Sequence, residues 1–427
     1  MKIANYKIVL LSSMGAGLEF FDFTIYALFA HYISINFFPQ TNTFIALINT
    51  FAIFAIGYLA RPLGGIILGH IGDRYGRKYA FSYAILVMAV ATLLIGCLPS
   101  YVMLGIYAPI LLIVLRLIQG LSMGGEVAGA ITFTLEHYEG FRKGLMQACI
   151  IFSMAFCSAI ASLVGYFLNH LFSSAQMISW GWRIPFAFGF LLGIVGFILR
   201  RRSLETPAFL EALREEEIHK IPLLILIKQF PTQVIFGLCL AALFGCYSSF
   251  LLFIPTYLSL HALFPADYGF ATSGVGFLTL GIVSLIGGYL ADRINLKILM
   301  VTGGFLFILF GFFVFPILVG ISVYNTTTLS LILIAIALLT TVVALANGVY
   351  AIAIAEQFPT TVKYSGIGLC QNLSFALIGG TAPLVFTSLI KSSNNLLAPY
   401  YYLVLWALIT IIAAIFYRRH TVPAVEV

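Results

Sequence analysis

Two acidic side chains, Glu19 and Asp22, lie three positions apart in a stretch of sequence that is otherwise almost entirely apolar. In a helix this spacing puts both carboxyl groups on one face, with Phe23 and Tyr26 at further helical steps. Two carboxylates so close together in a poorly solvated place cannot both ionise at low cost, so we expect one of them to hold a proton near neutral pH. Such a group can take up a proton on one side of a barrier and release it on the other.

A second pair of charges, Arg116 and Glu126, lies ten residues apart in a later apolar stretch. In a helix the two are about 15 Å apart along the axis. Arg116 can pair with one of the earlier carboxylates in one conformation and with a ligand in another. We predict that four residues handle the proton: Glu19, Asp22, Arg116 and Glu126. The alternative for the first three is a buried ion-pair group that only fixes helix packing.

The second half of the chain has no charged residue at mid-span, so there it can supply only hydrogen bonds and aromatic faces. The ligand-binding residues that we predict are Phe23, Tyr26, Arg116, Gln119, Tyr247, Tyr350 and Asn372.

Two ligand classes stay open. A quaternary-ammonium or amino-acid zwitterion would need an aromatic cage for its cation and Arg116 for its carboxylate. An organic acid would use Arg116, with or without Arg61. The residues slightly favour a solute that bears a carboxylate. We expect Arg61, next to Pro62, near the inner end of its helix, with its side chain reaching the lipid headgroups.

The composition indicates the kind of protein that holds these charges. Hydrophobic residues make up 61% of the 427 residues and charged residues only 9%, against about 45–50% and about 25% in soluble domains. A polytopic membrane protein is expected, and disordered chains, disulfide scaffolds and nucleic-acid binders are excluded. The six cysteines lie in apolar runs without the spacing of a metal site, and we expect no metal and no cofactor.

Each crossing of the lipid must be a helix of about 20 residues, because lipid offers the backbone no hydrogen-bond partners. Runs without Asp, Glu, Lys or Arg mark the crossings, and the run 298–355 is long enough, at 58 residues, to turn once within itself. We predict an all-α integral membrane protein with twelve helices, at residues 9–36, 44–68, 79–98, 104–135, 145–171, 183–200, 231–260, 268–291, 298–320, 328–355, 364–390 and 398–417.

The basic residues predict the orientation. With both termini in the cytoplasm, 18 of the 22 Lys and Arg residues fall in inner loops or termini, as the positive-inside rule requires. We therefore expect a multi-pass protein of the cell inner (cytoplasmic) membrane with cytoplasmic N- and C-termini.

The two halves of the sequence carry matching landmarks. The pairs Asp73-Arg74 and Asp292-Arg293 are 219 residues apart, and Glu136 and Glu356 are 220 apart. Nearly equal offsets indicate duplication of a six-helix unit, with a site between two facing bundles. The predicted domains are an N-terminal bundle (1–200), a cytoplasmic linker (201–229) and a C-terminal bundle (230–427).

The loop 69–78 (GHIGDRYGRK) holds glycines, an acid and bases at close steps. Its acid can sit against a helix N-terminus, and its last arginine can reach Glu136, so that the loop locks one conformation. We predict a conformational gate made of Gly69, Asp73, Arg74, Gly76, Arg77 and Glu136.

This loop resembles the signature loop of the major facilitator superfamily. Further segments resemble its metabolite:proton symporter family, which includes proline/betaine, shikimate and 2-oxoglutarate carriers: 17–23 (GLEFFDF), 60–65 (ARPLGG), 116–120 (RLIQG) with 124–126 (GGE), 180–186 (WGWRIPF), 204–209 (LETPAF) and 355–359 (AEQFP). The resemblance covers about residues 15–385.

The resemblance implies two pseudo-symmetric six-helix bundles and a secondary transporter that imports a small charged or zwitterionic metabolite with protons by alternating access. Its partners would be the solute, protons and membrane lipid, with no nucleic acid, and a monomer is expected. The alternatives are an uncoupled facilitator and a transporter-derived sensor. An enzyme is not expected, because no nucleophile–base set and no metal-ligand cluster lies within a span.

Overall fold

Helices make up the regular structure throughout the part of the chain that can be described. The computed structural model describes residues 2–39, 42–75, 77–125, 127, 129–131, 142–201, 226, 228–261, 264–320, 326–347, 350–359 and 362–417, and no strand occurs among them.

The first half contains α1 (Lys2–Leu28), α2 (Ala30–Phe37), α3 (Thr43–Tyr75), α4 (Arg77–Cys97), α5 (Tyr101–Leu104), α6 (Tyr107–Met123), α8 (Lys143–Leu171), α9 (Ser174–Ser179) and α10 (Ile184–Arg201). The second half contains α13 (Pro231–His261), α14 (Ala266–Ala291), α15 (Leu296–Gly320), α16 (Thr326–Asn347), α17 (Tyr350–Ala355), α18 (Lys363–Ser374), α19 (Ala382–Ser393) and α20 (Ala398–Phe416).

These helices supply the twelve predicted spans. Nine stretches of the described residues are long and apolar enough to cross a membrane by themselves. The bent pair α1 and α2 makes one more span, and the shorter apolar helices within α4 and α6 complete the set. The all-α prediction and the number of spans are therefore confirmed.

Three of the predicted helices are not continuous over their predicted ranges. The first bends by 58° between α1 and α2, although the bonds from Phe29 N to Ile25 O and from Ile33 N to Phe29 O continue across the bend. Between α5 and α6 the chain turns at Gly105, whose φ of 56° suits a residue without a Cβ. The eleventh span contains a π-helical turn, Phe375–Gly379, between α18 and α19.

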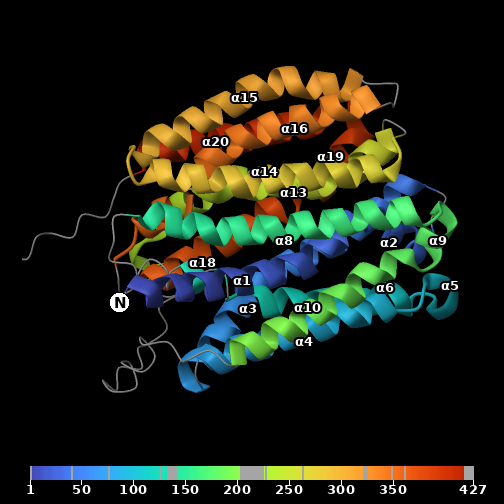
Figure 1. Cartoon of the computed structure of the whole chain (residues 1–427), viewed down its shortest axis with the longest axis horizontal. Coiled ribbons are helices and arrows are strands. Elements are labelled where there is room, and N and C mark those ends of the chain that lie inside the picture. The colour runs from blue at the N-terminus through green and yellow to red at the C-terminus, as the bar shows by residue number, and fades with distance from the viewer. Residues whose placement is uncertain are drawn as a thin grey trace, which may run out of the picture.

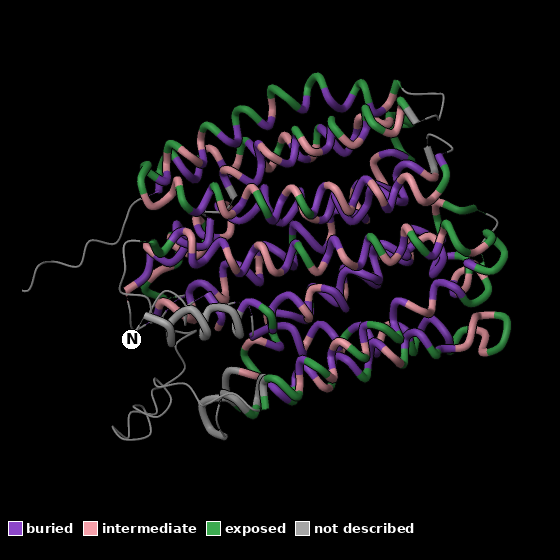
Figure 2. Tube along the Cα trace, in the orientation of Figure 1, coloured by how far each residue is buried: buried purple, intermediate pink, exposed green. Residues whose placement is uncertain are grey.

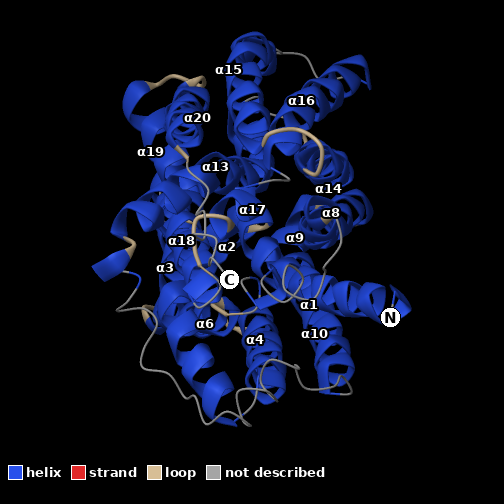
Figure 3. Ribbon diagram, turned by 90° about the vertical axis from the view of Figure 1, so that its left-hand side faces the viewer, coloured by secondary structure: helices blue, strands red, loops and turns tan. Residues whose placement is uncertain are grey.

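The two halves pack against each other mainly through α8 and α14, which lie side by side along their length (Figures 1 and 3). Glycines allow this approach, since a Cβ added at Gly288 would lie 2.5 Å from Gly144 O. Buried residues concentrate between the halves, whereas exposed residues follow the outer faces of helices such as α15 (Figure 2). Large apolar side chains on α15, among them Phe305 and Phe312, are exposed there, as expected of a surface that faces lipid.

We call the end of the bundle where α8 begins and α14 ends the inner end, because the charge pattern predicts that it faces the cytoplasm. There Asp292 accepts hydrogen bonds from Gly144 N (2.7 Å) and Leu145 N (3.1 Å), the first amides of α8. A carboxylate at a helix N-terminus satisfies orphan donors and complements the helix dipole. Asp292, which matches Asp73 in the first half of the sequence, thus ties the two halves together.

Aromatic contacts join the halves toward the opposite end. Phe29 packs against Phe270 of α14 with ring centroids 5.0 Å apart, and Phe51 of α3 packs against Phe253 of α13 at 5.6 Å. With contacts at both ends, the polar residues between the halves are enclosed.

Candidate functional site

Arg116 lies in the middle of α6 with no exposed surface, and aromatic rings surround its guanidinium group. Its Cζ is 4.2 Å from the ring centroids of both Phe23 and Tyr26 on α1, and 5.4 Å from that of Phe54 on α3. Aromatic faces stabilise a cation that has lost its water. The arrangement therefore keeps a positive charge between the helices of the first half.

The hydrogen-bond donors of this guanidinium group are unequally used by the described residues. Nη1 donates a 2.9 Å hydrogen bond to Gln119 Oε1, but Nε and Nη2 have no hydrogen-bond partner among the described residues. Nε–H and the adjacent Nη2–H form the fork that binds a carboxylate in a bidentate manner. Gly57 lies against this edge, where an added Cβ would be 3.3 Å from both nitrogens.

Asp22 is buried between α1, α4 and α10. Its carboxyl group hydrogen-bonds the hydroxyl group of Thr92 on α4. A Cβ added at Gly189 of α10 would fall on Oδ1, and one at Gly193 would lie 3.8 Å from Oδ2. Two glycines therefore make room for this carboxyl group, and Oδ1 has no hydrogen-bond partner among the described residues.

Gln119 and Thr92 stand between Asp22 and Arg116. Gln119 Oε1 accepts from Arg116, and Nε2 donates to Thr92 Oγ1 at 2.7 Å. The predicted pairing of Arg116 with Asp22 is therefore indirect in this conformation. Gln119, predicted to bind the ligand, uses both ends of its amide within the protein, which favours a positioning role.

Glu19 lies within electrostatic range of a cation other than the predicted Arg116. It interacts electrostatically with Arg61 of α3, so the two carboxyl groups of α1 have different neighbours. The expectation that Arg61 reaches the lipid headgroups is wrong, because its side chain is 1% exposed. Its guanidinium carbon lies 5.3 Å from the ring centroid of Tyr58 and 5.6 Å from that of Phe375 in the second half.

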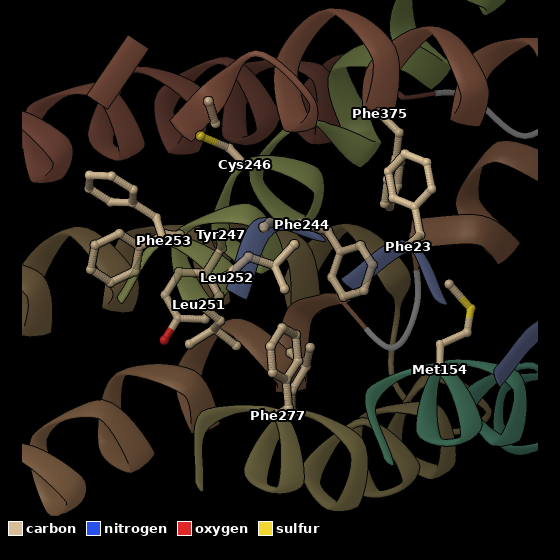
Figure 4. Close-up of a cluster of buried hydrophobic side chains, with 14 of the residues drawn as sticks. Phe23, Met154, Phe244, Cys246, Tyr247, Leu251, Leu252, Phe253, Phe277 and Phe375 are labelled. Atoms are coloured by element: carbon tan, nitrogen blue, oxygen red, sulfur yellow. The ribbon is translucent and has the colours of Figure 1, made fainter. Parts of the chain in front are cut away.

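The second half contributes aromatic rings and amides to the interface. Figure 4 shows buried side chains of both halves in one cluster, with Phe23 and Met154 from the first half and Phe244 and Phe375 from the second. The rings of Phe244 and Tyr350 stack at 5.0 Å.

The three ligand-binding residues predicted in this half have different surroundings. Tyr350 accepts a hydrogen bond from Gln371 and interacts electrostatically with Arg61. Asn372 Nδ2 donates to Gly124 O of the first half at 2.7 Å. Tyr247 is hydrogen-bonded to Thr340, within its own half.

Sequence reasoning missed several residues of the site. Thr92 looks like an ordinary helix threonine, and the π-helical turn that carries Phe375 has no sequence signal. Phe54 and Tyr58, four residues apart on α3 and flanking Gly57, give a signal that could have been used, because residues at this spacing share a helix face.

Other predicted residues lie outside the part that the structure describes. Glu126, Gly76 and Glu136 are outside the described residues, as are the side chains of Asp73, Arg74 and Arg77 and the surroundings of Gly69. Those parts of the predicted proton site and gate remain predictions.

Comparisons with known proteins identify the family. Residues 13–383 match the model of the Major Facilitator Superfamily. A putative proline/betaine transporter of Staphylococcus haemolyticus is 33% identical over 401 residues, covering 93% of this chain and 84% of the relative. The proline/betaine transporter of Escherichia coli K12 is 30% identical over 420 residues, covering 96% and 82%.

Solved structures show the same fold. A D-xylose–proton symporter superposes with a TM-score of 0.72 at 17% identity, covering 96% of each chain. The partially occluded, inward-open xylose transporter of E. coli gives 0.71 at 14% identity, covering 96% of this chain and 98% of that one. The twelve-helix fold with two six-helix bundles is thereby confirmed.

The chain belongs to the Major Facilitator Superfamily. It is a multi-pass membrane protein and a secondary transporter, and the named relatives are transporters, not enzymes.

Proposed function

We propose that this protein imports a small zwitterion bearing a carboxylate, of the proline or betaine class, together with protons by alternating access. The observation that carries the proposal is the buried guanidinium group of Arg116, whose Nε/Nη2 edge has no hydrogen-bond partner among the described residues. A buried cation with unsatisfied donors is costly unless an anion pairs with it during the cycle. The solute carboxylate is the anion that we assign to this edge.

The aromatic rings around Arg116 favour a zwitterion over a plain organic acid. The faces of Phe23 and Tyr26 hold the guanidinium group of Arg116 at 4.2 Å. The further rings of this region, Tyr58, Phe244 and Tyr350, are of the kind that binds an ammonium or quaternary ammonium group. The names of the relatives, which include a glycine betaine/proline/ectoine/pipecolic acid transporter of Dickeya dadantii at 30% identity, support this class.

Proton coupling is assigned to the buried carboxyl groups of α1. Glu19 and Asp22 are both 3% exposed, and an ionisable group within a span costs at least about 2.5–3.5 kcal/mol, which favours a functional role. The proposal keeps both termini in the cytoplasm and a monomer in the inner membrane as the working unit.

Uptake into proteoliposomes under an imposed pH gradient tests the proposal. Purified protein should accumulate L-proline or glycine betaine above the external concentration when the side from which the solute enters is acidic. Collapse of the gradient with a protonophore should abolish the accumulation. Equilibration without accumulation would indicate the uncoupled facilitator, and binding without transport would indicate the sensor.

A further inference from the structure

The hydrogen bonds between Asp22 and Arg116 form a continuous chain through two buried neutral side chains. Arg116 Nη1 donates to Gln119 Oε1 at 2.9 Å, and Gln119 Nε2 donates to Thr92 Oγ1 at 2.7 Å. The same hydroxyl group is hydrogen-bonded to Asp22. Gln119 and Thr92 have no exposed surface, so water does not compete for these bonds.

The hydroxyl group of Thr92 can adopt two orientations. It has one proton to give and two lone pairs to accept with, and Gln119 occupies one lone pair. Thr92 Oγ1 also lies 2.9 Å from Met88 O, one turn back in α4. If Thr92 gives its proton to Met88 O, its bond with Asp22 requires a protonated carboxyl group as the donor. If Asp22 is ionised it can only accept, so the hydroxyl proton must turn to it.

We propose that Thr92 and Gln119 are positioning residues that couple the protonation of Asp22 to the affinity of Arg116 for the solute carboxylate. With Asp22 ionised, the chain fixes a negative charge near Arg116 and partly compensates the guanidinium charge. With Asp22 protonated, that compensation is lost and the open edge of Arg116 binds an anion more tightly. This inference rests on the proposed function, and it explains why proton and solute would bind together.

The ionisable groups of the described residues on the helices around α1 include Glu19 and Tyr26 on α1 itself, Tyr58 and Arg61 on α3, and Arg116 on α6. Tyr83 on α4, Cys149 and Cys157 on α8 and Tyr247 on α13 belong to the same set. The Lys and Arg residues of α4 and α10 stand at the ends of those helices, and α13 contains no Asp, Glu, Lys or Arg. The neutral chain is thus the hydrogen-bonded route that the structure shows between Asp22 and a cation.

The test compares the pH dependence of binding in four proteins, with L-proline and glycine betaine as the probes. In the wild type, the half-saturation concentration should rise about tenfold between pH 5.5 and 8.5, because the binding-competent form takes up a proton. Thr92→Val, which keeps the side-chain shape, should reduce that ratio to less than about threefold, and Thr92→Ser should restore it.

Thr387→Val is the matched control, since Thr387 is also buried and its hydroxyl group donates to Pro383 O; it should keep the wild-type ratio. The same ratio in Thr92→Val as in the wild type would overturn the inference.

A second measurement needs no solute. The infrared absorption of the protonated Asp22 carboxyl group, identified as the band that Asp22→Asn removes, is followed against pH in the wild type and in Gln119→Met. Because Gln119 joins Thr92 to Arg116, a working link predicts that the midpoint of this titration moves in Gln119→Met. An unchanged midpoint refutes the link between Asp22 and Arg116. This measurement does not depend on the Thr92→Val variant, so it decides the question even if that variant fails to fold. A wild type without gradient-driven uptake, by contrast, refutes the proposed function, whatever the infrared result.

Discussion

At the scale of single residues, the site depends on a guanidinium group that aromatic rings surround and whose Nε/Nη2 edge has no hydrogen-bond partner among the described residues. Phe23 and Tyr26 satisfy the charge of Arg116 through their faces, which cannot accept strong hydrogen bonds. The Nε/Nη2 edge therefore keeps its capacity for a carboxylate. Affinity for the solute should depend on the shape of this group as well as on its charge.

Arg116→Lys separates these two properties. Lysine keeps the positive charge and can still lie over the rings, but it cannot bind a carboxylate with a planar fork. We expect the affinity for L-proline or glycine betaine to fall on the order of tenfold to a hundredfold, the loss of about one charge-assisted hydrogen bond. Ligand-induced thermal shifts of the purified protein measure this, with Arg201→Lys at the exposed end of α10 as the control. Wild-type affinity in Arg116→Lys would contradict bidentate binding.

Gly57→Ala tests the open edge with one methyl group. The new Cβ would lie 3.3 Å from Nε and from Nη2 of Arg116 and would crowd an approaching carboxylate. We expect the half-saturation concentration for uptake to rise about threefold to tenfold. In the control, Gly274→Ala on α14, the added Cβ meets Ser162 at an ordinary 3.5 Å, and uptake should be normal. Equal uptake by both variants would show that the solute does not use this edge.

At the scale of elements, helix ends and helix interruptions decide how the halves meet. The N-terminus of α8 is capped by Asp292 of the other half, and the π-helical turn in the eleventh span carries Phe375, whose ring lies over Arg61. π-Helical turns are frequent at functional sites, because one extra residue redirects a side chain. Both features are contacts between the two halves.

Asp292→Ala should loosen the inner end. It removes two charge-assisted hydrogen bonds from Gly144 N and Leu145 N, and we expect the closed inner end to lose about 1.5–3 kcal/mol. Hydrogen–deuterium exchange of peptides that cover the start of α8 should become faster than in the wild type. Asn295→Ala, which removes only a local contact at the start of α15, should leave that exchange unchanged. Unaltered protection in Asp292→Ala would show that the cap does not hold this end.

At the scale of the whole molecule, contacts between the two halves lie at both ends of the bundle, and the buried charges of the first half lie between those ends. Phe29 and Phe270 close one end and Asp292 with α8 the other. Alternating access requires that the two sets of contacts break in turn while the charges stay between them. Exchange of internal for external solute needs no net movement of protons. Uphill uptake differs from exchange because the site must also bind and release a proton in each cycle.

Asp22→Asn should separate exchange from accumulation. The amide keeps the shape of the carboxyl group but cannot carry a proton, so exchange of internal for external solute should continue while uphill uptake is abolished. Counterflow and gradient-driven uptake in the same proteoliposomes measure the two activities. Asp267→Asn, at the start of α14, is the control and should retain both. Accumulation by Asp22→Asn at the wild-type rate would remove Asp22 from proton coupling.

The sequence alone determined the membrane class, the twelve spans and the presence of buried charges. Length and apolarity fix a membrane helix, because lipid leaves no other way to satisfy the backbone. Intramembrane charges such as Asp22 and Arg116 are conspicuous for the same reason. The spacing of residues along a helix could not reveal which charged side chains are neighbours in the fold. The rotation of each helix about its axis and its position along the membrane normal depend on packing against other helices.

Only the tertiary structure decided which residues surround each buried charge. In the structure Asp22 lies beside Thr92 and the glycines of α10, and Glu19 lies within electrostatic range of Arg61. Arg61, which the sequence predicts at the headgroups, is buried. The physical reason is that contacts between side chains far apart in the sequence follow from close approach of helices at small residues such as Gly57. That approach is a property of pairs of helices, and no periodicity within a single helix encodes it.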